Sequence, residues 1–154
     1  MNLATVDEIL DRCKRKKSAL IGILQDIQAE YNYLPKEALL RVRESLNIPL
    51  TQIYGIASFY KSFSLRPRGK YIVNVCLGTA CHVRGAVRIL EEVERDLGIK
   101  SGQTTKDSNF TLETVNCLGA CALGPLMVVN EQYYGKMTPG KAKKALRNYR
   151  GQNK

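Results

Sequence analysis

Four of the five cysteines lie in two short glycine-containing segments, Cys76-Leu-Gly-Thr-Ala-Cys81 and Cys117-Leu-Gly-Ala-Cys121. Each segment directly follows a run typical of a β-strand, residues 71–75 before the first and 110–115 before the second. Four thiolates brought together form a soft, anionic cage, which suits zinc or an iron–sulfur cluster. The residue types therefore indicate a site for a thiophilic metal centre.

The spacing of the cysteines favours one of these centres. Structural zinc sites usually take cysteines in pairs two to four residues apart, whereas a gap of four residues recurs in plant-type 2Fe–2S proteins. Cys76 and Cys81 have that longer gap, and a binuclear cluster needs longer loops than a single ion. A thiol-disulfide enzyme would instead need Cys-x-x-Cys, and no second pair facing it. Spacing favours iron–sulfur, with zinc as the alternative.

The order of the predicted elements brings the two cysteine segments together. Residues 66–154 read as β-α-β-β-β-α, an α/β pattern that is the order of a minimal thioredoxin-like domain. The first two strands are joined by a crossover helix, so we expect them to be parallel and adjacent. Both cysteine segments would then lie at the same sheet edge. The predicted strands are 71–75, 110–115, 126–130 and 132–134, and the predicted helices are 83–97, stopped by Gly98, and 139–149.

Residues 1–65 predict a small N-terminal helical bundle with no evident chemistry. Four amphipathic stretches follow one another with short links, and their apolar stripes are typical of a core. The turn-rich segment Ser64-Leu-Arg-Pro-Arg-Gly69 separates this bundle from the domain of residues 66–154. Thr5 or Asp7 is expected to cap the first helix and Ser18 to start the second. Pro35 is expected in the first turn of the third helix, and Thr51 is expected to cap the fourth.

Composition indicates a soluble protein of the cytoplasm. The chain has 154 residues, 44% of them hydrophobic, and an odd number of cysteines, which argues against a secreted disulfide framework. The first ten residues lack the basic lead and apolar block of an export signal, and the run Ala19–Leu24 is too short to cross a bilayer. We expect no direct membrane insertion.

The formal net charge of +10 is concentrated in the second half of the chain. From Lys136 to Lys154 there are seven Lys and Arg residues and no acid. This stretch is either a solvated helix face or a docking surface for an acidic partner. No helix-turn-helix, zinc-finger or aromatic RNA-binding motif accompanies the charge, so a basic nucleic-acid-binding module is a weaker alternative.

A resemblance to a known family rests on five segments: 76–81, Val83-Arg-Gly-Ala86, 116–121, Gly124-Pro125 and 134–139. They resemble the thioredoxin-like 2Fe–2S subunit of NADH dehydrogenase modules, a family that includes the small iron–sulfur subunit of complex I and relatives in NAD(P)-linked hydrogenases and formate dehydrogenases. Residues 53–60 resemble its helical region, so the likeness covers nearly the whole chain. Leu77–Ala80 resembles the hydrogenase-type and electron-bifurcating branches more than it resembles many complex I subunits.

The resemblance implies that Cys76, Cys81, Cys117 and Cys121 bind one 2Fe–2S cluster. It also implies a larger flavin-bearing, NAD(P)H-binding iron–sulfur subunit as partner. The chain would then be a non-catalytic electron carrier, in agreement with the lack of a Gly-x-Gly-x-x-Gly or P-loop motif.

Several neighbouring residues carry smaller expectations. Gly78, Gly119 and Gly124 are expected to let backbone approach the cluster and donate N–H groups to its sulfurs. His82 is expected to tune the site, because a Rieske-type cluster needs two histidines and the chain has one. Cys13 is expected to be a spare thiol. Pro125 occupies a place where thioredoxin-like folds often hold a cis proline.

Overall fold

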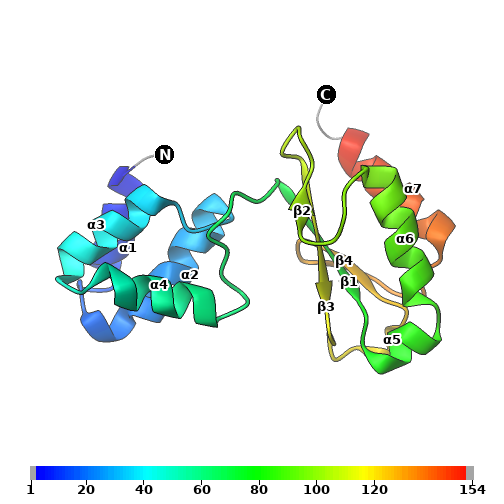
Figure 1. The fold of residues 1–154 in the computed structure, drawn as a ribbon, viewed down its shortest axis with the longest axis horizontal. Helices are drawn as coiled ribbons and strands as arrows, with labels where there is room; N and C mark the ends of the chain where they lie inside the picture. The colour runs from blue at the N-terminus through cyan, green and yellow to red at the C-terminus, as the bar shows by residue number, and fades with distance from the viewer. Residues whose placement is uncertain (1–2, 152–154) are drawn as a thin grey trace. The chain divides into compact units, whose positions relative to one another are not determined.

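The computed structural model describes residues 3–151, so Lys154 of the basic stretch lies outside the described residues. The chain divides into two compact units, the first ending at Arg68 and the second beginning at Gly69 (Figure 1). Within residues 3–151, no helix is long and apolar enough to cross a membrane.

The first unit consists of four α-helices around one apolar core. They are α1 (Leu3–Arg12), α2 (Leu20–Tyr31), α3 (Lys36–Leu46) and α4 (Leu50–Phe59), and a 3-10 turn, η1 (Lys17–Ala19), precedes α2. Each helix contributes fully buried aliphatic side chains to the shared core, for example Leu10, Ile27, Leu39 and Ile53. The predicted helical bundle is therefore confirmed.

All four predicted helix starts differ from the observed ones. Ser18 lies in η1, and α2 begins after it, at Leu20. Helix α1 begins at Leu3, ahead of Thr5 and Asp7, and α4 begins at Leu50, ahead of Thr51. Pro35 lies just before α3 rather than in its first turn. The reason at α3 and α4 is the same, because Pro35 and Pro49 hold extended N-cap conformations (ψ 141° and 139°) and the helix starts at the next residue.

The second unit is built on a five-stranded mixed sheet with the order β2-β3-β1-β4-β5. Strands β1 (Tyr71–Cys76) and β3 (Phe110–Val115) are parallel neighbours, with Tyr71 opposite Phe110 and Cys76 opposite Val115. Strand β4 (Met127–Val129) pairs antiparallel with β1, and β5 (Gln132–Tyr134) pairs antiparallel with β4. The predicted pairing is confirmed, and both strands that precede cysteine segments end at one edge.

A short strand, β2 (Gln103–Thr104), was not predicted. It pairs antiparallel with β3 inside a polar segment. Two residues carry too little alternation to be recognised in a sequence. The hydroxyl groups of Thr104 and Thr111, 2.8 Å apart, join it to β3.

The predicted helix 83–97 is wrong as a single element. The structure has α5 (Thr79–Val83) and α6 (Ala86–Leu97), because Gly85 takes a φ of 95° that interrupts the helix. Gly98 ends α6 in a left-handed conformation, as expected.

One face of the sheet is covered by α6 and by α7 (Pro139–Gly151) (Figure 1). Ile89 and Val93 of α6 and Leu146 of α7 are buried with the inward side chains of β1, β3 and β4. The predicted α/β class is confirmed, and this packing fixes the strands whose ends carry the cysteines.

Candidate cofactor site

The first cysteine segment turns from strand into helix. Cys76 is the last residue of β1, and its N–H donates to the carbonyl of Leu126 at 3.0 Å. Cys81 lies in α5, after the turn at Gly78. Both thiols are buried, with 3% and 2% of their residue surfaces exposed. The first pair therefore forms the inner wall of the site.

The second cysteine segment follows β3 and forms an open loop. Cys117 and Cys121 are both exposed, and Cys121 begins the short 3-10 helix η2 (Cys121–Leu123). Gly119 takes a φ of 77°, which glycine adopts at little cost, and its N–H donates to Cys117 Sγ at 3.3 Å. The expected donation of glycine N–H groups to the sulfurs of a cluster stays a prediction.

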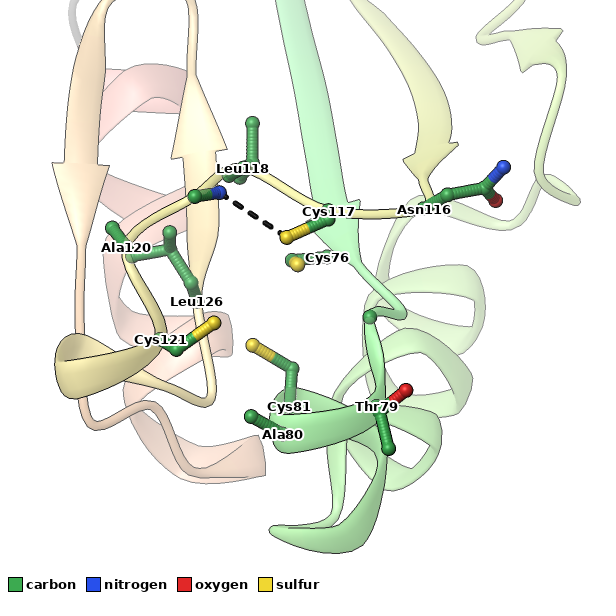
Figure 2. Close-up of a pocket in the computed structure, with 12 residues that line it drawn as sticks. Cys76, Thr79, Ala80, Cys81, Asn116, Cys117, Leu118, Ala120, Cys121 and Leu126 are labelled. Atoms are coloured by element: carbon green, nitrogen blue, oxygen red, sulfur yellow. Dashed lines mark hydrogen bonds between the residues drawn. The ribbon is translucent and has the colours of Figure 1, made fainter.

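The two segments enclose one pocket of about 320 Å³. All four cysteines line it, and Figure 2 shows the sulfur atoms of Cys81, Cys117 and Cys121 directed toward its interior. Leu118, Ala120 and Leu126 supply apolar surface around the thiols. Within residues 3–151, no three His, Cys, Asp or Glu side chains are drawn together as a single metal ion requires.

Burial and the neighbouring thiols shape the protonation of the inner pair. Burial raises the pKa of the Cys81 thiol, and a hydrogen bond with Cys76 raises it further. A hydrogen bond with the backbone of Leu126 acts in the opposite direction. Without a metal, Cys81 therefore holds its proton more firmly than an ordinary thiol. Because thiolate is the ligating form, loading of the site would release that proton.

Two glycines allow the segments to approach more closely than side chains permit. A Cβ on Gly78 would lie 2.6 Å from the carbonyl oxygen of Asn116, and a Cβ on Gly124 would lie 3.1 Å from Cys81 Sγ. The N–H of Gly124 donates to the carbonyl of Cys121 at 3.1 Å. Four soft donors, a pocket and a close backbone cradle fit a thiolate-bound binuclear cluster.

The remaining predicted residues lie around or away from this pocket. His82 is exposed in α5, directly after Cys81. Cys13 belongs to the first unit, whereas the four other cysteines belong to the second. The peptide bond between Gly124 and Pro125 is cis, as expected from the sequence.

One residue that bears on the site escaped the sequence reasoning. The guanidinium of Arg84 donates from Nη1 to the carbonyl oxygens of Cys121 at 2.7 Å and Gly124 at 3.3 Å. Its only signal in the sequence is its place three residues after Cys81. An exposed arginine between two helices is ordinarily a solvated side chain.

Fold and site together define a small thioredoxin-like domain whose sheet edge carries a four-thiol pocket. Residues 6–150 match the family described as Thioredoxin-like [2Fe-2S] ferredoxin. The chain is 39% identical over 144 residues to the HndA subunit of the NADP-reducing hydrogenase of Solidesulfovibrio fructosivorans, covering 94% of this chain and 84% of that protein. It is 35% identical over 129 residues to an NADH-quinone oxidoreductase subunit of Aquifex aeolicus (strain VF5), covering 84% of this chain and 81% of that protein.

The chain therefore belongs to the thioredoxin-like [2Fe-2S] ferredoxin family. The family resemblance predicted from the sequence is confirmed, and the predicted cofactor, a 2Fe–2S cluster, is the one this family is described by.

A solved structure agrees with the observed fold. The crystal structure of an NAD+-reducing [NiFe]-hydrogenase in the air-oxidized state superimposes with a TM-score of 0.77 at 19% identity. The match covers 88% of this chain and 23% of that chain. At this identity the likeness concerns the fold alone.

Proposed function

We propose that this chain is the electron-transfer subunit of a multisubunit NAD(P)-linked oxidoreductase. In this proposal Cys76, Cys81, Cys117 and Cys121 hold one 2Fe–2S cluster. The observation that carries the proposal is the shared pocket, which two strand ends supply with four thiols. The relatives support it, since their names are those of a hydrogenase subunit and of an NADH-quinone oxidoreductase subunit.

When bound, a 2Fe–2S cluster accepts and returns one electron at a time. The chain's own residues give the site an inner and an outer side. Cys76 and Cys81 are buried on the inner side of the site, and the apolar side chains of Leu118 and Leu126 limit the access of water to the thiols. Cys117 and Cys121 lie on the exposed loop, so a partner could approach the site from this side.

The chemistry of NAD(P)H implies a flavin in a partner subunit. A hydride carries two electrons together, so a flavin must stand between the nucleotide and a one-electron carrier. The sequence offers no dinucleotide fingerprint of its own. We therefore propose a larger flavin-bearing, NAD(P)H-binding iron–sulfur subunit as partner, and no turnover by the isolated chain. We place the protein in the cytoplasm, where a reducing environment keeps thiols available as ligands.

Serine substitution of single cysteines tests the ligand set. Anaerobically purified protein should contain two irons and two sulfides per chain and give a one-electron EPR signal on reduction. Replacing any of the four cysteines by Ser should lower cluster content or stability. Cys13→Ser is the control and should leave both unchanged, because Cys13 lies in the other unit. Stoichiometric zinc without iron, in protein from an iron-replete host, would favour the four-Cys zinc-stabilised interaction domain instead.

Nucleotide titration tests whether NAD(P)H binds to the partner subunit and not to this chain. Calorimetry on the cluster-loaded chain should detect no NAD(P)H binding, and the chain alone should not reduce an artificial acceptor. Anaerobic mixing with NAD(P)H should bleach the visible absorption only after the flavoprotein partner is added, provided that the cluster potential lies within reach of that donor. Stoichiometric nucleotide binding, or steady turnover without the partner, would contradict the carrier assignment.

A further inference from the structure

The connection between α5 and α6 holds the second cysteine loop through one side chain. Arg84 comes from this connection, yet Nη1 donates to two carbonyl oxygens of the other loop, those of Cys121 and Gly124. A carbonyl oxygen that receives a charged donor makes a stronger hydrogen bond than one that receives a neutral donor. Arg84 therefore ties the segment containing Cys121 to the helix that contains Cys81.

The same side chain brings a positive charge close to the thiols. Cys81 Sγ and Arg84 Nη1 lie 3.1 and 3.3 Å from the single point where a Cβ on Gly124 would stand. The separation between the sulfur and the nitrogen therefore cannot exceed the sum of these two distances. That sum is shorter than the Debye screening length, which is about 8 Å at physiological ionic strength. Within residues 3–151, no carboxylate forms an ion pair with Arg84 that would offset this charge.

We propose that Arg84 is a positioning residue for the cluster site: it clamps the two cysteine loops together, and its charge raises the reduction potential of the bound cluster. The inference rests on the proposed function, because it needs a cluster in the four-thiol pocket. Reduction adds a negative charge to a site that is already anionic, and a nearby guanidinium favours that state. The two carbonyl contacts slow the opening of the outer loop, through which the cluster would be lost.

Three variants separate the clamp from the charge. Arg84→Gln removes the charge and the forked donor, whereas Arg84→Lys keeps the charge but loses the planar fork. Arg88→Gln is the matched control, since Arg88 is exposed, lies in the first turn of α6 and makes no side-chain hydrogen bond or ion pair with the described residues. All three are compared with wild type for cluster loss, followed by visible absorption under an anaerobic chelator, and for midpoint potential, followed by EPR.

The expected results differ between the variants. Arg84→Gln should lose its cluster roughly tenfold faster, the factor equivalent to one charge-assisted hydrogen bond, and its midpoint potential should become more negative. Arg84→Lys should lose the cluster at an intermediate rate and keep a potential close to wild type. Arg88→Gln should match wild type in both measurements.

Other results would overturn the proposal. If Arg84→Gln behaves like Arg88→Gln, there is no clamp. If it loses the cluster faster at an unchanged potential, Arg84 is a structural tie with no electrostatic role. If circular dichroism shows that Arg84→Gln does not fold, Arg84→Lys is the deciding variant. A rate of cluster loss equal to that of wild type would then refute the clamp. A midpoint potential more negative than that of wild type would refute the role of the charge. A wild-type chain that holds zinc and no iron–sulfur cluster overturns the proposed function, and this inference with it.

Discussion

Replacing Gly78 by Ala would force the two cysteine loops apart. Gly78 precedes α5 with φ −56° and ψ 155°, a conformation that alanine adopts without strain. The added Cβ would stand 2.6 Å from the carbonyl oxygen of Asn116 and 3.4 Å from Cα of Cys117. Both neighbours are backbone atoms, so a side chain cannot simply rotate away. The strand end before Cys117 has to move.

The size of the effect follows from two opposing contributions. Overpacking a close contact costs about 1–3 kcal/mol, while replacing glycine by alanine in an allowed conformation returns about 0.4–1 kcal/mol through the unfolded chain. We therefore expect a net loss of about 1–2 kcal/mol in the free energy of unfolding of the second unit. For a unit of this size, each kcal/mol lowers the melting temperature by about 4–8 °C.

The assay is thermal unfolding of the cluster-loaded protein, together with the rate of cluster loss under a chelator. Gly78→Ala should melt lower and lose its cluster faster than wild type. Gly140→Ala is the matched control, because Gly140 lies in the first turn of α7 and a Cβ there meets no atom within 4 Å. If Gly78→Ala melts and releases its cluster like Gly140→Ala, the loops do not approach each other as closely as the structure has them.

Two further predictions concern charge and pH. Reversing Lys143, Lys144 and Arg147 of α7 to Glu should slow association with the flavoprotein partner in low salt without changing cluster content, whereas unchanged association rates would make this a solvated face. Burial and the hydroxyl of Tyr134 raise the pKa of Tyr149 to about 12. The unfolded chain releases this proton near pH 10 and the native chain does not, so stability falls between about pH 10 and 12. Tyr149→Phe should flatten this alkaline decline in melting temperature, and an equally steep decline would contradict the raised pKa.

Those parts of the fold that depend on periodic burial could be predicted from the sequence. The strand-like runs of residues 71–75 and 110–115 and the crossover between them predicted two parallel strands, and the register from Tyr71 with Phe110 to Cys76 with Val115 confirms this. Helix boundaries were harder. A cap residue such as Thr51 competes with the rigid Pro49 shortly before it, and the sequence does not show which one sets the start.

Convergence of the two cysteine segments was predictable because it follows from topology, whereas the contacts that hold them together were not. Periodicity reports which side chains are buried, and Arg84 is exposed. Its partners are carbonyl oxygens of a loop 37 and 40 residues away, which every residue type would supply equally. Gly78 likewise meets the backbone of Asn116, so no pair of side-chain types records the contact. The sequence therefore predicts which thiols converge. How firmly the two cysteine segments are held together depends on backbone contacts that only the three-dimensional arrangement reveals.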